Sequence, residues 1–293
     1  MQIQDLLLLK KKTIEQRLKE LIPLFDSPQV TLFEAASYAL LLPGKRLRPL
    51  FVLCIAEDLG IPIEHAIDPA SAIELIHTYS MIHDDLPCMD DDDLRRGMPT
   101  LHKVYGEGQA VLAGDYLLTY AFEILANAPH LEASQKLDLI DILSKRSGGK
   151  GMIGGQVVDL LYEGKEINQE SLDFMYAHKT AALFAAALEF GAVIGNLPLQ
   201  DRHHLKNCGV SFGIGYQMTD DILDISSDEK TLGKPIGSDE KNQKATCLSL
   251  YQREKAEERS KNFLTRAIDE LSFLSRPLPF LQALLQKCQL RLK

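Results

Sequence analysis

Six aspartates lie within ten consecutive positions of this chain, from Asp84 to Asp93, in the stretch SMIHDDLPCMDDDDLRRG at residues 80–97. Close carboxylates repel one another, which raises their pKa values and costs stability. Two explanations are open at this point: a solvated acidic loop, or side chains that surround something strongly positive. Pro87 disfavours helix at the residue before it, so Asp84 and Asp85 are predicted near a helix C-terminus. Negative charge is unfavourable there unless a cation binds.

A second acidic group, Asp220, Asp221 and Asp224, occurs in YQMTDDILD. Asp220 and Asp224 are four residues apart on one helix face, with Gln217 on the same stripe. Like charges at this spacing destabilise a helix unless a cation neutralises them. Two such groups, each at the end of an apolar helix, predict carboxylates that face one another across a cavity. Their hard oxygens suit Mg²⁺, which binds a few carboxylates together with phosphate oxygens of a ligand.

Basic residues are placed to bind the other oxygens of such a ligand. Lys45 and Arg48 in PGKRLRP are predicted in the first turn of a helix, after Gly44 ends the one before it, and a helix N-terminus with two cations is an anion site. Arg95 and Arg96 follow the first acidic group, and a planar guanidinium suits phosphate oxygens. Further candidates are His77, Lys179, Lys234 and Lys244.

Structural alternatives are open for these basic residues. Arg95 and Arg96 could form exposed salt bridges with Asp90 to Asp93, which contribute roughly 0–1 kcal/mol. A lone histidine on a helix, such as His77, is more often structural than a ligand contact.

The elements that must position these residues are predicted to be helices. Residues 3–25 carry apolar side chains at helical spacing, and residues 171–195 and 203–225 are long apolar stretches without alternating polarity. No Asn-Gly or Asp-Gly turn joins alternating strands. Gly and Pro occur where helices would join, but no stretch is long enough to be a domain linker. We therefore predict a single all-α domain over residues 1–293, with ten or more helices.

Composition excludes several function classes. The net charge of −9 argues against general binding to nucleic acid or to anionic membranes. Five scattered cysteines without a CxxC pair predict reduced thiols. The apolar run at residues 6–9 is too short for a signal peptide or a membrane span. We therefore expect a soluble, cytoplasmic protein without stable membrane insertion, in which an anionic ligand is held by local basic groups or by metal.

The chain resembles the short-chain trans-isoprenyl diphosphate synthases, most closely the bacterial-type farnesyl diphosphate synthases. The motifs that carry the resemblance are GKRLRP, ELIHTYSMIHDDLPCMDDDDLRRG, LAGDYLL, GMIGGQVVDL, HKTAAL, GIGYQMTDDILDI and TLGKPIGSDEKNQKAT. The resemblance implies an all-α bundle around a deep central cavity, a homodimer, and Mg²⁺ as the cofactor with three ions per active site. It also implies a prenyltransferase that condenses isopentenyl diphosphate head-to-tail with dimethylallyl or geranyl diphosphate, giving mainly farnesyl diphosphate (C15).

The resemblance also implies a role for each matching residue. The metal ligands would be Asp84, Asp90 and Asp220, with Asp85, Asp221 and Asp224 in support. Isopentenyl diphosphate would be held by Lys45, Arg48, His77 and Arg96. The allylic diphosphate would be contacted by Arg95, Lys179, Gln217, Lys234 and Lys244. Thr180 would turn its dipole toward the developing carbocation, Gln156 and Asp159 would support the cavity wall, and Tyr79, with the insertion of Pro87 and Cys88, would limit the product to C15.

The chemistry implied agrees with the charges. An allylic diphosphate must ionise, and Mg²⁺ with Arg and Lys side chains stabilises the departing diphosphate electrostatically. The carbocation then needs a dry cavity. Two stretches depart from the family pattern: Lys150 lies in SGGKGMIGG, where we expect a surface turn, and SDEKNQKATCLSLY keeps only Lys244 and Thr246 of the usual ending.

Other functions remain as alternatives. Within the family, the product could be geranyl or geranylgeranyl diphosphate. An α-helical metal phosphohydrolase is suggested by His83 beside Asp84, but His77 is six residues away and cannot converge with His83 on one metal. A non-catalytic subunit is disfavoured because both acidic motifs are intact. A terpene cyclase is disfavoured because the second motif here is DD-x-x-D.

Overall fold

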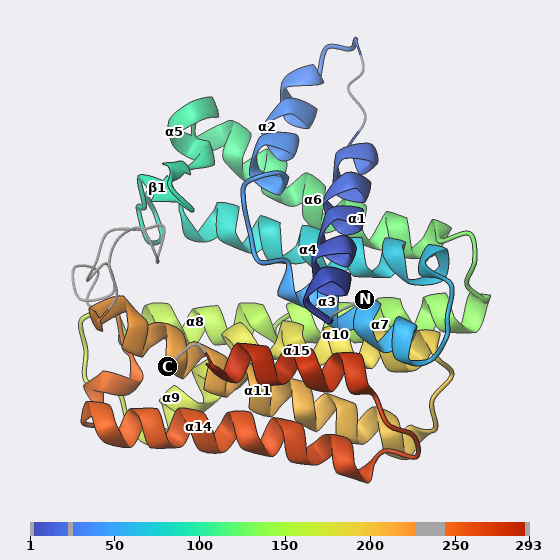
Figure 1. Ribbon diagram of the computed structural model, residues 1–293. Helices are drawn as coiled ribbons and strands as arrows, with labels where there is room; N and C mark the ends of the chain where they lie inside the picture. Colours follow the sequence, from blue (N-terminus) through green and yellow to red (C-terminus); the bar gives the residue numbers. More distant parts are fainter. Residues whose placement is uncertain (1–2, 23–25, 227–243, 291–293) are drawn as a thin grey trace.

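The computed structural model describes residues 3–22, 26–226 and 244–290, and this part of the chain is built almost wholly from helices (Figure 1). The α-helices are α1 (Ile3–Leu21), α2 (Val30–Leu40), α3 (Leu47–Asp58), α4 (Ile63–Asp84), α5 (Leu101–Tyr105), α6 (Glu107–Asn127), α7 (Ala133–Ser147), α8 (Met152–Tyr162), α9 (Gln169–Met175), α10 (Ala181–Ile194), α11 (Leu199–Ser226), α14 (Arg253–Glu270) and α15 (Pro279–Gln289). Shorter elements are the π-helical turn η1 (Tyr176–Thr180) and the 3₁₀ turns η2 (Cys247–Ser249) and η3 (Leu271–Phe273). The predicted all-α fold with ten or more helices is confirmed.

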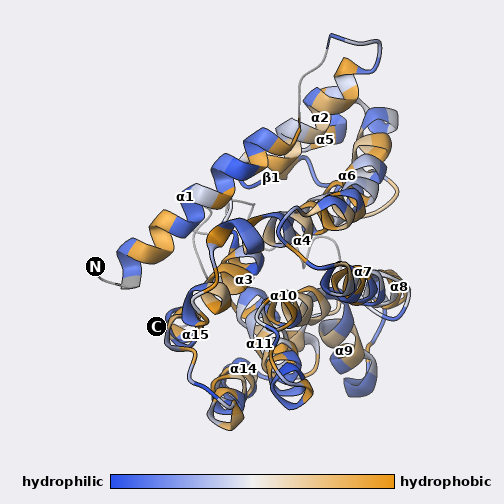
Figure 2. Ribbon diagram, turned by 90° about the vertical axis from the view of Figure 1, so that its right-hand side faces the viewer, coloured by the Kyte–Doolittle hydropathy of each residue, from blue (hydrophilic) through white to orange (hydrophobic). Residues whose placement is uncertain are grey.

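Helix α10 lies at the centre of the bundle and packs against α3, α4, α7 and α11. Figure 2 views several of these helices nearly along their axes, with apolar colour toward the interior of the bundle. Every residue of α10 except Glu189 is buried. Its alanines let neighbouring helices approach closely: a Cβ on Gly213 of α11 would lie 2.3 Å from Ala181 Cα. The small side chains of the α10 alanines, together with Gly213, permit this spacing.

Three aromatic rings join the helices that carry the site. Phe51 of α3, Phe184 of α10 and Phe212 of α11 are almost fully buried. Their ring centroids are 5.0–5.8 Å apart in edge-on geometry. Burying one such side chain stabilises the fold by roughly 1.5–3 kcal/mol, and edge-on pairs add about 0.5–1.5 kcal/mol. The rings hold α3 and α11 against α10.

Several predicted helix boundaries were wrong. Helix α1 ends at Leu21, and residues 23–25 lie outside the described residues. Helix α2 ends at Leu40, so Gly44 does not end a helix. Helix α3 begins only at Leu47, because Arg46 adopts a left-handed conformation with φ 53°. The chain turns sharply there, and Lys45 therefore lies before the helix and not in its first turn.

Two further features were not predicted. The long helix expected over 171–195 contains the π-helical turn η1 between α9 and α10. A short antiparallel pair, β1 (Leu94–Arg95) and β2 (Met98–Pro99), is joined by Arg96 and Gly97. Both joining residues have positive φ, 55° and 78°, as a two-residue hairpin turn of this hand requires. Arg-Gly is not among the common signals for such a turn, so the sequence did not indicate it.

One helical run, Gln169–Ile194, is long and apolar enough to cross a membrane by length and composition. Within its most apolar window, 72% of the residues are buried inside the bundle. The run includes α10, so its apolar character is accounted for by its place in the core.

Candidate active site

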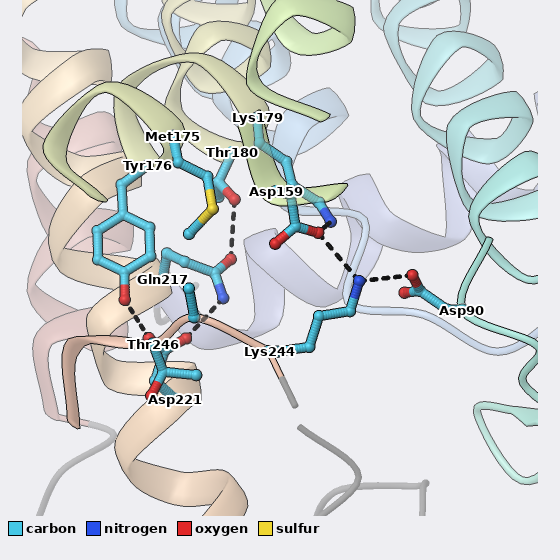
Figure 3. A pocket seen from close by; sticks show the side chains of 11 residues that line it. Asp90, Asp159, Met175, Tyr176, Lys179, Thr180, Gln217, Asp221, Lys244 and Thr246 are labelled. Atoms are coloured by element: carbon cyan, nitrogen blue, oxygen red, sulfur yellow. Dashed lines mark hydrogen bonds and ion pairs between the residues drawn. The ribbon is translucent and has the colours of Figure 1, made fainter. Parts of the chain in front are cut away.

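A pocket of about 100 Å³ lies between α8, η1, α11 and the segment that leads into η2 (Figure 3). It is lined by Asp90, Asp159, Met175, Tyr176, Lys179, Thr180, Gln217, Asp221, Lys244, Ala245 and Thr246. Asp90 belongs to the first acidic group and Asp221 to the second. The fold thus brings parts of both groups, distant in sequence, to one pocket.

Two lysines neutralise the carboxylates on one side of this pocket. Lys244 Nζ lies 2.7 Å from Asp90, 3.1 Å from Asp159 and 3.6 Å from Glu163. Lys179 Nζ lies 2.6 Å from Asp159. Burial raises the pKa of Asp159, but the two lysines outweigh burial and hold that pKa below its ordinary value. Figure 3 shows the Lys244 side chain reaching between Asp90 and Asp159, so Lys244 lies in the pocket despite the altered motif around it.

A hydrogen-bonded chain forms the other side of the pocket. Thr180 Oγ1 donates to Gln217 Oε1 (2.8 Å), and Gln217 Nε2 donates to Asp221 Oδ1 (2.9 Å). Asp221 Oδ2 accepts from the Tyr176 hydroxyl and from the Cys247 backbone N–H (3.0 Å). Burial, followed by the Asp221 charge, raises the pKa of Tyr176, so this hydroxyl stays protonated and donates. One carboxylate therefore ties η1, α11 and the segment of Lys244 together.

The charge of Asp221 sets the direction of every bond in this chain. An ionised carboxylate can only accept, so it fixes the Gln217 amide with its nitrogen toward Asp221 and its oxygen toward Thr180. The Thr180 hydroxyl must then donate its hydrogen bond to Gln217. Its oxygen lone pairs remain for the pocket, which Thr180 lines. The π-helical turn η1, a feature often found at functional sites, carries both Lys179 and Thr180.

The first acidic group is folded back on itself by its loop. The Asp90 N–H donates to the Asp84 backbone oxygen (2.8 Å), which returns Asp90 to the end of α4. Burial raises the pKa of Asp84, and its other neighbours include Lys179, which opposes the rise, and Asp90, which adds to it. Asp84 thus lies within electrostatic reach of the pocket lysine.

The sequence left two explanations open for the acidic run, a solvated loop or side chains around a positive group, and the remaining aspartates of the run include examples of both. Asp85 is buried, forms an ion pair with Arg95, and has a pKa raised to about 6 by burial. Arg95 also contacts Asp92 (3.1 Å). Asp93 is exposed and contacts Lys103 (2.7 Å). Of the pairing with Asp90 to Asp93 that the sequence left open, Arg95 makes the contact with Asp92, while its other partner is the buried Asp85 and the end of the run is a solvated surface.

A group of basic side chains lies beside the pocket helices. Arg48 is stacked over the Phe184 ring, 4.3 Å from guanidinium carbon to centroid, and Lys45 Nζ is 3.5 Å from the Tyr216 hydroxyl. In the described part of the chain, Arg48 forms no ion pair, and its Nε has no hydrogen-bond partner. Burial lowers the pKa of Arg48 to about 10, and Asp220 is one of the acids that oppose this effect.

Arg96 and His77 complete this cation group. Among the described residues, the hydrogen bonds of the Arg96 guanidinium are long, to Leu42 O (3.5 Å) and Met81 Sδ (3.7 Å). It lies so close to Gly44 that a Cβ there would be 2.5 Å from its Nη1. Burial, and after it the neighbouring arginines, lower the pKa of His77 well below its ordinary value. We refer to Lys45, Arg48 and Arg96, together with the uncharged imidazole of His77, as the cation group.

Tyr79 lies one turn before the acidic end of α4. Its ring is buried and meets His83 edge-on, with centroids 5.7 Å apart. Burial, and next the Asp84 charge, raise the pKa of Tyr79 to about 12. Its hydroxyl has no hydrogen-bond partner among the described residues. The side chain thus contributes a protonated, apolar surface close to Asp84.

Other predicted residues lie around the pocket without lining it. Gln156 is on α8, and neither atom of its buried amide has a hydrogen-bond partner in the described structure. Asp220 is half-buried and Asp224 buried, both on α11. Lys150 lies in an exposed turn, as expected. Lys234 lies outside the described residues.

Sequence reasoning missed four residues that hold the site together. Tyr176 and the backbone of Cys247 both bind Asp221, and Arg46 forms a buried ion pair with Glu74. Arg46 lies inside the GKRLRP motif, in which only Lys45 and Arg48 were predicted to have a role. Neither residue type nor spacing distinguishes Tyr176 or Glu74 from ordinary helix residues.

Mg²⁺ fits the donor chemistry of this site. The pocket lining offers aspartate oxygens and contains no His or Cys, which is a donor set for a hard cation. Among residues 3–22, 26–226 and 244–290, no three His, Cys, Asp or Glu side chains are grouped so that they could hold a metal ion. Lysine ammonium groups balance Asp90 and Asp159 instead.

Comparisons with known proteins agree with this geometry. The family model for polyprenyl synthetase matches residues 29–273. The chain is 43% identical to the farnesyl diphosphate synthase of Bacillus subtilis (strain 168) over 249 residues, which cover 84% of each chain. It is 40% identical to the farnesyl diphosphate synthase of Escherichia coli (strain K12) over 262 residues, 87% of this chain and 85% of that one.

Solved structures show the same similarity over almost the full length. An FPP/GFPP synthase from Zymomonas mobilis, in its apo form, matches with a TM-score of 0.87 and 35% identity, covering 98% of both chains. A geranyltransferase from Helicobacter pylori, complexed with magnesium and isoprenyl diphosphate, matches with a TM-score of 0.87 and 36% identity, covering 98% of this chain and 96% of that one. Family model, relatives and structures agree, and this chain belongs to the polyprenyl synthetase family.

Proposed function

We propose that this protein is a Mg²⁺-dependent prenyltransferase that condenses isopentenyl diphosphate with dimethylallyl and geranyl diphosphate and releases mainly farnesyl diphosphate. The observation that carries the proposal is the pocket in which Asp90, Lys179, Lys244 and the Thr180–Gln217 pair come together beside the cation group. The curated relatives named farnesyl diphosphate synthase support the activity and the C15 product.

The two charged regions would bind two different diphosphates. Lys179 and Lys244 face the pocket, and we assign them to the allylic diphosphate together with Gln217; Lys234 has the same assignment from the resemblance. The cation group would bind isopentenyl diphosphate. The resemblance assigns Arg95 to the allylic diphosphate. Arg95 forms an ion pair with Asp85, so it would contact the substrate while it also contacts Asp85.

Asp84, Asp90 and Asp220 are the proposed principal Mg²⁺ ligands, with three ions per active site and with Asp85 and Asp224 nearby in support. Bound Mg²⁺ would supply charge stabilisation for the departing diphosphate. The Thr180 oxygen, freed for the pocket by Gln217, would face the allylic carbocation with its negative end. Asp221, with its three donors, would act by positioning, and Asp159 would orient the two lysines.

The protein's own side chains would also keep water from the cation. The helix after Thr180 presents buried Ala, Leu and Phe residues, which hold no nucleophile. The isopentenyl double bond would then attack, and the released diphosphate would accept the proton lost from the adduct. Tyr79 would limit product length, with Gln156 part of the cavity wall.

We further propose a single polyprenyl synthase domain over residues 1–293, a homodimer and a cytoplasmic location, all by similarity to the family. The proposed activity is tested by incubating purified protein with Mg²⁺, isopentenyl diphosphate and dimethylallyl diphosphate. After dephosphorylation, mass analysis of the prenyl alcohols should show farnesol, and EDTA should abolish it. Release of phosphate without any prenyl alcohol longer than C5 would overturn the proposal in favour of a phosphohydrolase.

A further inference from the structure

A buried ion pair lies directly beneath the cation group. Arg46 Nη1 is 2.7 Å from Glu74 Oε1, and both side chains are almost fully buried, with 1% and 2% of their surface exposed. Arg46 Nη2 donates to Leu40 O (3.0 Å) and Leu42 O (2.7 Å). The guanidinium thus joins the end of α2, the start of α3 and the middle of α4.

The backbone of Arg46 is held in a costly conformation. Its φ of 53° lies in the left-handed region, which costs a non-glycine residue about 1–2 kcal/mol. The contacts of the Arg46 side chain hold this turn, and the turn separates Lys45 from Arg48. Leu42 O accepts from Arg96 as well as from Arg46, so the Arg46 side chain shares an acceptor with one arginine of the cation group.

Glu74 is the acid that most favours the charged forms of Arg48 and Arg96. Among the acids that raise the pKa values of Arg48 and Arg96 against the effect of burial, Glu74 is the first for both. It lies on α4 one turn before His77. In the described structure its direct ion-pair partner is Arg46, and neither Arg48 nor Arg96 forms an ion pair with it. Glu74 is therefore a potential competitor for the two arginines that face the substrate.

We propose that Arg46 is a positioning residue that occupies Glu74 and so keeps Arg48 and Arg96 available for the diphosphate of isopentenyl diphosphate. This inference rests on the proposed function, because it takes the cation group as the site of that substrate. Without the Arg46 guanidinium, the buried Glu74 carboxylate needs another cation. Arg48 and Arg96 are the candidates, because Glu74 is the first of the acids that raise the pKa of each, and pairing with Glu74 would remove them from the substrate.

The test compares three variants with the wild-type enzyme: Arg46→Met, Glu74→Gln and the double variant. The readouts are the KM for isopentenyl diphosphate, the KM for geranyl diphosphate, kcat, and the calorimetric Kd for isopentenyl diphosphate without the second substrate. Arg46→Met should raise the KM and Kd for isopentenyl diphosphate at least tenfold, with the KM for geranyl diphosphate within about threefold of wild type. Adding Glu74→Gln should restore most of the lost affinity, because no carboxylate then competes. Glu74→Gln alone should bind isopentenyl diphosphate no more weakly than wild type.

Arg146→Met is the matched control, because it breaks an ion pair with Glu189 (2.8 Å) on α7 and α10, away from the cation group. It should alter stability without changing either KM. A double variant that binds as weakly as Arg46→Met, or equal changes in both KM values, would overturn the inference. If Arg46→Met does not fold, the double variant carries the test: wild-type-like binding supports competition by Glu74, and weak binding refutes it. Absence of condensation by the wild-type enzyme would instead refute the proposed function.

Discussion

Asp221→Asn separates two roles for the central aspartate of the second acidic motif. The carboxylate accepts from Tyr176, from the Cys247 N–H and from Gln217. Asparagine has the same shape but presents an NH₂ group on one side. If its oxygen keeps Tyr176 and Cys247, its NH₂ meets the Gln217 nitrogen, and the Gln217 amide must turn over. Gln217 would then donate to Thr180, and the Thr180 proton would point into the pocket.

The size of both effects follows from the contacts. A hydrogen bond to a charged group contributes roughly 1.5–3 kcal/mol, against about 1 kcal/mol for a neutral one. Weakening three of them should cost about 2–4 kcal/mol. With an unfolding entropy of about 2.1 cal/mol/K per residue, this lowers Tm by about 3–7 °C. Reversing a preorganised dipole beside a developing charge should lower kcat by about 10²-fold, by analogy with the loss of one oxyanion-hole donor.

The assay is kcat and Tm, together with the Mg²⁺ concentration that gives half-maximal activity. Asp221→Asn should lower kcat and Tm and leave the Mg²⁺ requirement unchanged. Tyr176→Phe is the matched control, because it removes one donor without reversing the chain. It should lower Tm and leave kcat within about threefold of wild type. A raised Mg²⁺ requirement in Asp221→Asn with an unchanged Tm would refute the positioning role and indicate a metal ligand.

Three further predictions concern single residues. Burial depresses the folded-state pKa of His77 below 6.5, so the unfolded chain binds more protons than the folded one below that pH. The free energy of unfolding of the wild-type protein should therefore fall between pH 6.5 and 5, by up to about 1.4 kcal/mol per pH unit. Urea titration should show a smaller fall for His77→Gln. Lys244→Gln leaves Asp90 without this lysine. In steady-state kinetics we expect the KM for geranyl diphosphate to rise at least tenfold and the KM for isopentenyl diphosphate to change little. Equal changes in the two KM values would contradict the assignment of Lys244 to the allylic diphosphate. Tyr79→Ala should lengthen the product beyond C15 in mass analysis, and an unchanged product profile would show that Tyr79 does not limit chain length.

Long-range features of the fold were predictable because helix signals are strong and numerous here. The Ala-rich stretch around Lys179 was expected to be helical, and α10 is a helix, almost wholly buried. The π-helical turn that precedes it was not predicted; its Tyr176 and Thr180 make tertiary contacts with α11 that local spacing does not indicate. The left-handed Arg46 was missed for the same reason: its contacts are with the end of α2 and with Glu74.

The candidate site shows the same division. Charge crowding and helix spacing indicated which acids and bases would gather, and the fold brings Asp90, Lys179 and Lys244 together. The sequence alone did not indicate which acidic and basic side chains of this cluster pair with one another. It gave no signal that Asp85, expected to support the metal site, pairs with Arg95, or that Asp221 accepts from Tyr176, Gln217 and the Cys247 N–H. Partner choice depends on distances of a few ångströms, which residue type and spacing do not specify.

The most direct test of the shared metal site is a crystal structure with Mn²⁺ in place of Mg²⁺ and with inorganic diphosphate, in which anomalous scattering locates each ion. We predict ions bound by Asp84 and Asp90 on one side and by Asp220 on the other, with all of them contacting a single diphosphate. Ions at only one of the two acidic motifs, or a diphosphate bound without metal contact, would contradict the account.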